Sequence, residues 1–515
     1  MKRIYSKYMA VLLLVSFVLV SCKKSFLETN PRGQFQLANY YTTPDQAFAG
    51  LAAAYDPLVS ETGGLDGSLS DSRGLLNSGS DDCFAGGGGS GDVTNWQLFN
   101  NYQMTSGLGP QLNFWGIDFL GVSRANTIIN VLQTTSIAGL SDVVKNRYIA
   151  EATFLRAHYY FDLVRLFKNI PLITTPLAPE DIYKQTQADP VAVYASIEND
   201  LQAAIPNLPV TVSGSELGRI TRGAAIALLG KVYLYEKKYT QAATQLAIVN
   251  GIPGGTTAIY GYHLQSDYGQ VFSPDNKFNS ESVFEWNFSP NQAYDWGNWG
   301  TFKGDVYVQM VGVRDYGGPV YASGWGFNPV TAQLVSAFTT PYYGGSVTDP
   351  RYGYTILNMD SLAKAQNTTY SPSYQNTGYF TLKYAPLNKY KAIAGPPDLN
   401  YPNNYIEIRL ADTYLMEAEA LLQGGGDAAR AAALLNAVRA RVGLAPVTAT
   451  MANIKAERRL ELATEGHRWF DLVRWGDAPS ALAFKGFTTG KNEILPIPLT
   501  ELANTKLVQN PGYPQ

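Results

Sequence analysis

Apolar side chains recur at helical spacing in two long zones of the chain. Trp115, Phe119, Val122 and Ile129 fall on one face of a helix predicted over residues 112–132. The first zone predicts further helices over 44–58, 146–168, 190–205, 221–236 and 239–249. The second zone predicts helices over 405–422 and 428–442. The pattern therefore indicates a mainly α-helical protein.

Two of these helices in each zone form a close pair. Residues 221–236 and 239–249 are joined by a very short turn and are rich in Ala and Gly, which lets two helices approach closely. Residues 405–422 and 428–442 repeat the arrangement around three consecutive glycines. Such pairs are typical of degenerate tetratricopeptide repeats, although an irregular helical bundle would show the same periodicity.

The string FDLVR occurs twice, at residues 161–165 and 470–474. In each copy Leu and Val extend an apolar stripe begun by an aromatic residue, and Asp and Arg lie three residues apart. An exposed ion pair of this kind contributes only about 0.3–0.5 kcal/mol, whereas burial of each large side chain contributes roughly 1.5–3 kcal/mol. We therefore interpret the string as a packing device and expect Trp469, which precedes the second copy, to be buried.

Between the helical zones, residues 251–404 lose this periodicity and become rich in Gly, Pro, Asn, Tyr and Trp. Only short strands are predicted, over 282–288 and 379–384. A second loop-rich patch covers 61–95 and contains the string FAGGGGSGD. Because that string lacks the Gly-Lys-Ser/Thr ending of a phosphate-binding loop, we interpret it as a flexible loop.

The N-terminus predicts export and lipid anchoring. Lys2, Arg3 and Lys7 precede an apolar run over 11–20 that is too short to span a bilayer comfortably. The run ends in Leu-Val-Ser-Cys, so residues 1–21 read as a lipoprotein signal peptide and Cys22 as the lipidated residue. Cys83 is the other cysteine, so lipidation of Cys22 would leave no pair for an internal disulfide.

Composition narrows the class of ligand. The chain carries 16% charged residues and a formal net charge of −3, and no basic stripe suggests a nucleic-acid partner. Aromatic residues make up 12%, with 34 Tyr and 8 Trp. Few charges and many aromatic rings fit a protein that meets neutral, hydroxyl-rich or apolar ligands, or one that uses its tyrosines in the core.

Several segments resemble the SusD/RagB-like outer-membrane lipoproteins of Bacteroidetes, and together they cover essentially the whole chain. They are SCKKSFLETNPRG after the apolar run, AEATFLRAHYYFDLVRLFKNIPL at 150–172, YIEIRLADTYLMEAEALL at 405–422, LLNAVRARVGL at 434–444, ERRLELATEGHRWFDLVRWG at 457–476 and ILPIPLTELANTKLVQNPGY near the end. One departure is the tether, where Lys23 and Lys24 follow Cys22 and the first acid is Glu28. Acidic residues near the lipidated cysteine often favour surface export in this group.

The resemblance implies a helical fold with about four tetratricopeptide-like units and a loop-rich subdomain. The expected segments are a helical N-terminal domain over 22–250, a loop-rich ligand-binding region over 251–404 and a C-terminal helical segment over 405–515 that packs on the N-terminal helices. The implied role is capture of glycan, or less often peptide, at the cell surface for a SusC-like TonB-dependent transporter. Some relatives carry calcium, but no calcium site can be assigned here, and no other cofactor is expected.

Tryptophans in the loop-rich region are the candidate glycan platforms, because aromatic faces stack on the C–H faces of sugars. Trp296, Trp299 and Trp325 flank glycines, whereas Trp286 lies in an alternating run and is expected in the core. Asn328-Pro329 would form a helix start beside Trp325. From the second patch, the resemblance adds Asp71, Arg73, Asn95 and Trp96; each ring could instead be a loop anchor.

Enzymatic alternatives find little support in the sequence. The three histidines do not form a metal-ligand cluster with Cys83, and no pair of carboxylates is singled out for catalysis. A glycosidase nevertheless stays an alternative, because acidic residues beside aromatic ones serve binding and hydrolysis equally well. We therefore expect a non-enzymatic glycan-binding subunit, with a peptide-binding subunit as the second hypothesis.

Overall fold

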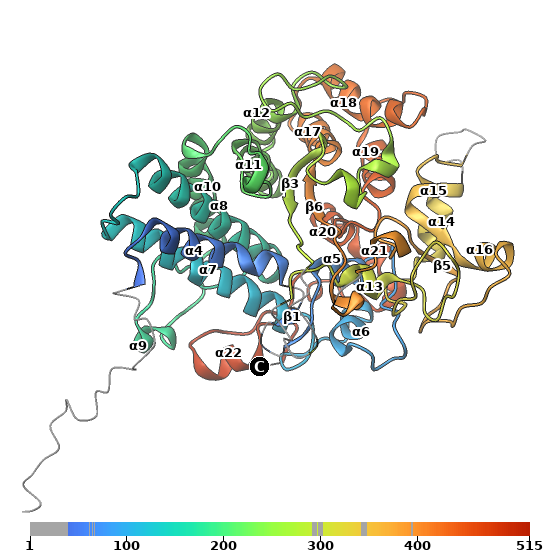
Figure 1. Ribbon diagram of the computed structural model, residues 1–515, viewed down its shortest axis with the longest axis horizontal. Coiled ribbons are helices and arrows are strands. Elements are labelled where there is room, and N and C mark those ends of the chain that lie inside the picture. Colours follow the sequence, from blue (N-terminus) through green and yellow to red (C-terminus); the bar gives the residue numbers. More distant parts are fainter. Residues whose placement is uncertain are drawn as a thin grey trace, which may run out of the picture.

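The computed structural model describes residues 40–60, 62–63 (backbone only), 65, 67–290, 296, 302–340, 348–392 and 395–514. Within these ranges helices predominate, as the periodicity predicted, and strands form small antiparallel pairs. Figure 1 shows two groups of helices, one N-terminal and one C-terminal, with strands β3 and β6 between them.

The N-terminal group is built from α4 (Pro44–Tyr55), α7 (Gln111–Thr134), α8 (Asp142–Phe167) and α10 (Pro190–Ala204), which pack side by side. Each predicted helix exists, with ends shifted by a few residues. Thr43 and Gln46 form a capping box at α4, and the Asp189 side chain caps α10 in front of a proline at its first position. Local capping signals therefore set where α4 and α10 begin.

The two predicted helix pairs pack against each other. Helices α11 (Arg222–Tyr235) and α12 (Tyr239–Asn250) form the first pair, and α17 (Leu410–Gln423) and α18 (Ala428–Arg441) form the second. A Cβ atom at Gly230 of α11 would lie 2.6 Å from the Cγ atom of Leu246 in α12, so only glycine permits this approach. Helix α12 also packs on α17, which joins the C-terminal helices to the N-terminal ones.

The helix predicted from residue 405 was wrong in its first five positions. Tyr405–Arg409 is strand β6, paired antiparallel with β3 (Ser282–Trp286), and α17 begins only at Leu410. The β-branched residues Ile406 and Ile408 alternate with polar ones, which suits an extended chain, and pairing with β3 satisfies the backbone. The strand predicted over 282–288 is confirmed over its first five residues.

The remaining elements are short. The loop-rich parts contain α5 (Ser72–Gly79), α6 (Thr94–Asn100), α13 (Tyr307–Val311), α14 (Ala332–Thr339), α15 (Tyr352–Thr355), α16 (Met359–Ala365) and the pairs β1 (Thr62–Gly63)–β2 (Ser68–Leu69) and β4 (Ile356–Asn358)–β5 (Tyr379–Thr381). Elsewhere lie α9 (Pro179–Ile182), α19 (Met451–Glu461), α20 (Arg468–Trp475), α21 (Ala478–Ala481) and α22 (Leu499–Asn504).

The two FDLVR copies contact each other. The guanidinium carbon of Arg165 lies 4.1 Å from the ring centroid of Phe161 in its own copy and 4.0 Å from that of Phe470 in the other. Trp469 is fully buried, as predicted. The ion pairs, however, are not the exposed pairs considered from the sequence, because the side chain of Arg165 is 5% exposed and that of Asp471 is 6% exposed. Both copies therefore pack in one interior.

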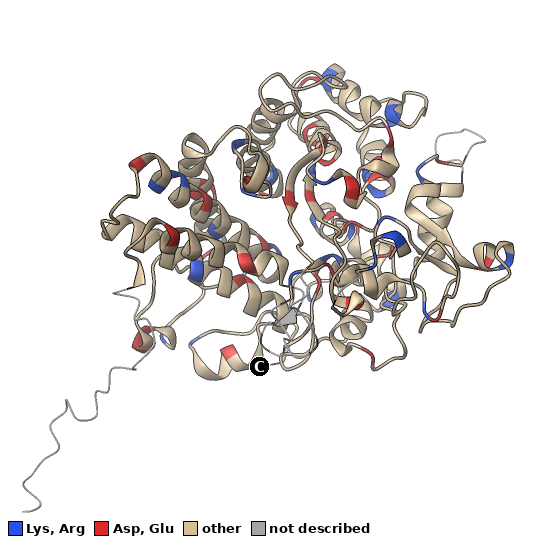
Figure 2. Cartoon of the chain, viewed as in Figure 1, with Lys and Arg blue, Asp and Glu red and all other residues tan. Residues whose placement is uncertain are grey.

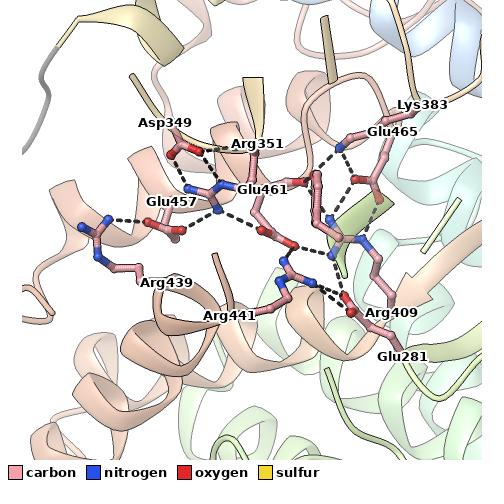
Figure 3. A network of polar contacts seen from close by, with 11 residues as sticks. Glu281, Asp349, Arg351, Lys383, Arg409, Arg439, Arg441, Glu457, Glu461 and Glu465 are labelled. Carbon is pink, nitrogen blue, oxygen red and sulfur yellow. Dashed lines mark hydrogen bonds and ion pairs between the residues drawn. The ribbon is translucent and has the colours of Figure 1, made fainter. Parts of the chain in front are cut away.

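A buried network of charges underlies the C-terminal helices (Figure 3). Arg409, at the end of β6, pairs with Glu281, Glu461 and Glu465, and every one of these side chains is fully buried. The network continues through Asp349, Arg351, Lys383, Arg439, Arg441 and Glu457. It ties the loop-rich region to α18 and α19 with compensated charges rather than apolar contacts.

The helices of the described part carry charges of both signs and are not membrane-spanning. Figure 2 shows Lys and Arg interspersed with Asp and Glu over the helices. Among the residues that the structure describes, each helix is too short or too polar to cross a lipid bilayer.

Candidate ligand-binding surface

Two tryptophans of the loop-rich region form a pair at the surface. Trp296 is 47% exposed, and its ring centroid lies 6.1 Å from that of Trp325, with the ring planes inclined by 36°. Trp325 is half-buried and packs against the main core, so it anchors the pair while Trp296 faces solvent. Two neighbouring rings of this kind offer an apolar platform of the size that a sugar chain covers.

The backbone around Trp325 is held by close contact between two glycines. A Cβ atom at Gly324 would lie 2.3 Å from the Cα atom of Gly312, so both positions need glycine. The N–H group of Trp325 donates to the carbonyl of Gln309, and that of Phe327 donates to the carbonyl of Met310. Helix α13 therefore fixes the segment that carries Trp325, and the ring is presented by ordered backbone.

The segment after Trp325 is anchored by Asn328, but not as a helix cap. Asn328 adopts a left-handed conformation with φ of 49°, and its side chain accepts a hydrogen bond from the Tyr307 hydroxyl and donates to the carbonyls of Gly74 and Phe84. The helix start predicted at Asn328-Pro329 was wrong, because α14 begins at Ala332 and its cap is Thr331. Asparagine is common both at helix N-caps and in left-handed turns, and at this position hydrogen bonds to distant segments stabilise the turn.

Trp96 and Asn95 lie behind this segment rather than on the surface. The Trp96 ring is fully buried, 5.2 Å from the ring centroid of Phe327, and a Cβ atom at Gly74 would lie 1.9 Å from it. Asn95 is 3% exposed and donates to Asn113 at 2.8 Å. Trp96 therefore packs behind the segment that follows Trp325, whereas Asn95 links α6 to α7.

Asp71 and Arg73 are likewise interior. The Arg73 guanidinium group, fully buried, donates to both carboxylate oxygens of Asp305 at 2.8 and 3.0 Å and to Asp71 at 2.7 Å. Its carbon atom lies 4.6 Å from the ring centroid of Tyr307, in α13. Asp71 also caps α5 by accepting from the N–H group of Gly74. Arg73 thus fixes the start of α13, which in turn holds Trp325.

These four predicted site residues are therefore all buried, and two of them, Arg73 and Trp96, contact Tyr307 of α13. Of the other predicted site residues, Trp299 and the lipidation candidate Cys22 lie outside the described residues. Cys83 is a buried free thiol, and burial raises its pKa. Within the described ranges, no group of three His, Cys, Asp or Glu side chains could hold a metal ion.

Arg314 is a polar neighbour of the platform that our choice of tryptophans left out. It is partly exposed, and its side chain lies beside Gly326, where a Cβ atom would come within 2.8 Å of it. Its guanidinium group approaches the Gly-rich loop at Gly88. Glycines 86 and 87 of that loop are buried against the segment after Trp325, and the Gly87 N–H group donates to the Gly326 carbonyl. The only sequence signal was that Arg314 opens a string rich in Gly, Tyr and Trp.

Trp286 is half-buried between the two helical groups. Its indole N–H group donates to Glu407 at 2.8 Å, and Glu407 also bonds His158 at 2.8 Å. Burial alone would raise the pKa of Glu407, but the positive charge of His158 lowers it to about 2. The ring therefore packs at the edge of the main core, where the sequence placed it inside, and its indole makes a partly buried polar contact.

Comparison with known proteins agrees with this architecture. Residues 280–491 match the SusD family, and residues 86–234 match the family described as "Starch-binding associating with outer membrane". A solved laminarin-binding SusD-like protein is 45% identical, with a TM-score of 0.85, and the match covers 92% of this chain and 100% of that one. The chain belongs to the SusD family.

Two further similar proteins have descriptions that name a glycan ligand. Surface glycan-binding protein A from Bacteroides thetaiotaomicron, solved in complex with laminarihexaose, is 26% identical with a TM-score of 0.81, and the match covers 91% of this chain and 100% of that one. The starch-binding protein SusD from the same organism is 25% identical over 73% of this chain and 74% of its own length.

Proposed function

We propose that this SusD-family protein captures a neutral oligosaccharide on the Trp296–Trp325 platform. The observation that carries the proposal is the exposed Trp296 ring beside the half-buried ring of Trp325, whose backbone is fixed by α13 and by glycine contacts. Arg314 is the neighbouring group that would donate hydrogen bonds to sugar hydroxyls. The laminarin-binding and laminarihexaose-bound relatives make a β-glucan the first ligand to test.

The wider role follows from the family. We propose that the protein is anchored in the outer membrane through lipid on Cys22, faces the cell exterior, and passes its ligand to a SusC-like TonB-dependent transporter without hydrolysing it. The description "Starch-binding associating with outer membrane" supports the location. Absence of a barrel protein after mild-detergent purification of the tagged chain from native membranes would contradict the partnership.

Calorimetric titration with laminarihexaose tests the platform. Trp296→Ala and Trp325→Ala should each weaken binding about 5- to 30-fold, because each removes an aromatic contact of about 1–2 kcal/mol. Tyr183→Ala, at another exposed aromatic residue, should bind as the unaltered protein does. Unchanged affinity in both tryptophan variants would refute the platform, and binding confined to a peptide library would favour the peptide-binding alternative. New reducing ends in the incubated glycan would instead show a glycosidase.

A further inference from the structure

A cleft lined by residues between 210 and 285 lies apart from the tryptophan platform. It is a cleft of about 200 Å³ between the loop before α11, the turn at residues 260–262 and the segment 278–285 that includes β3. None of its lining residues belongs to the tryptophan platform. Its volume lies below the roughly 300–1,000 Å³ of sites for drug-sized ligands, which points to a ligand about the size of one sugar ring.

Aromatic side chains from two segments of the chain line this cleft. The rings of Tyr260 and Tyr262 stack with centroids 5.6 Å apart and planes 15° apart, because Gly261 between them takes a left-handed φ of 72°. Phe278 and Phe284 contribute rings from the other segment. Phe278 itself has a φ of 52°, which a bulky residue rarely adopts, and such strained residues gather at ligand sites.

The strained turn at Phe278 is held by a carboxylate. The N–H group of Phe278 donates to both oxygens of Glu285, at 2.9 and 3.2 Å, and the Asn404 amide donates to Glu285 at 2.7 Å. Burial raises the pKa of Glu285. Hydrogen bonds within the fold therefore already engage this carboxylate.

The second charged residue of the cleft, Arg219, forms ion pairs within the fold. Arg219 donates to both oxygens of Glu151, at 2.7 and 3.1 Å, and to Glu216 at 2.8 Å. The other polar lining groups are hydroxyls and an amide, from Thr211, Thr221, Asn279, Ser280 and Ser282. A charged ligand would find no uncompensated partner among these groups, whereas a ligand with apolar faces and a rim of hydroxyls would match them.

We propose that this cleft is a second carbohydrate site, which takes a single neutral pyranose ring between Tyr260 and Phe278. The site is independent of the platform, since it shares no residue with it and its ligand class follows from its own lining. The protein would then hold one sugar chain or two separate sugars at two places on its surface.

The test uses methyl β-D-glucopyranoside as the probe in ligand-detected NMR titrations of the full chain. The background is the Trp296→Ala/Trp325→Ala double variant, which removes the platform. On this background Thr211→Trp, at an exposed position on the rim, should fill the cleft and weaken probe binding by about tenfold or more. Ser213→Trp is the matched control, because Ser213 is exposed nearby and does not line the cleft.

The proposal is overturned if the double variant does not bind the probe, or if adding Thr211→Trp leaves its affinity for the probe unchanged. It is also overturned if Thr211→Trp and Ser213→Trp lower that affinity equally. Thermal melts confirm that each variant is folded. A crystal soaked with the probe gives a readout that needs no substitution: a sugar ring beside Tyr260 supports the site, and sugar at the tryptophan pair alone contradicts it. Laminarihexaose binding to the two single tryptophan variants tests the platform in a separate experiment. Failure of the platform proposal therefore does not affect the test of the cleft, and failure of the cleft proposal does not affect the test of the platform.

Discussion

Replacement of Arg409 by methionine tests whether the buried charges hold the loop-rich region to the helices. The Arg409 side chain is fully buried and pairs with Glu281, Glu461 and Glu465 (Figure 3). Removal of one member of a buried ion pair costs about 3–5 kcal/mol, because an uncompensated charge is left in the interior. Arg409 serves three carboxylates, so we expect a loss near the upper end, about 5 kcal/mol.

Other cations limit the loss. Lys383 stays paired with Glu465 in the variant, and Arg441 stays paired with Glu281 and Glu461. The variant should therefore lose far less free energy of unfolding than the breaking of three separate ion pairs would cost. It is still a large part of the roughly 5–15 kcal/mol by which folded proteins are stable.

The pH dependence of this loss gives a second signature. Burial alone would raise the pKa of Glu465, but the Arg409 charge lowers it below its ordinary value. In the native protein, Glu465 therefore contributes stability above its unfolded pKa, and this is lost as pH falls through the lower folded value. Without Arg409, burial should raise the folded pKa above the unfolded one. The variant should then take up a proton on folding, and its deficit should shrink between pH 7 and pH 5.

Urea titrations followed by tryptophan fluorescence measure both effects. Lys184→Met is the control, because its ion pair with Asp181 is exposed and should contribute no more than about 1 kcal/mol. A deficit below about 1 kcal/mol for Arg409→Met, or one that is the same at pH 7 and pH 5, would refute the reasoning.

Two further predictions concern single side chains. Trp469→Ala should lower the free energy of unfolding by about 3–5 kcal/mol, because the ring is fully buried. Trp325→Ala should change it by about 1 kcal/mol or less, because that ring is half-buried. If denaturation shows the larger loss for Trp325→Ala, the division between packing rings and platform rings is wrong. Burial lowers the pKa of His467 to about 4, whereas the unfolded value is near 6.5. Between these two pH values the unfolded chain binds more protons than the folded one. The free energy of unfolding should therefore fall by up to about 3 kcal/mol as pH drops across this window. His467→Gln should flatten this slope relative to the native protein, and parallel slopes would show that another group is responsible.

Much of the helical scaffold followed from local signals. The predicted helices and the short turns between paired helices are present because apolar periodicity, capping residues and small side chains act within a few residues of each other. Strand β6 was missed for the same reason. Tyr405–Arg409 adjoins a strong helical pattern, and only pairing with β3, more than a hundred residues earlier, makes it extended.

The burial of the candidate site residues could be predicted only in part. The tryptophan-rich string correctly indicated Trp296 as an exposed ring, because a sequence rich in glycine and polar residues is typical of surface loops. The same reasoning could not show that Trp96 and Arg73 are interior. Arg73 is buried by its bond to Asp305, which lies 232 residues away in the sequence. Charged side chains enter a core only with such partners, and a linear sequence does not reveal them.

By itself, then, the sequence determined the fold class, the positions of the helices and the two aromatic strings that pack together, because these depend on neighbours a few residues apart. Tertiary structure alone decided which rings face solvent, which charges neutralise one another and where a cleft opens beside Tyr260. Those properties depend on contacts between segments that meet only in the folded chain, and burial and electrostatic compensation are set at those contacts.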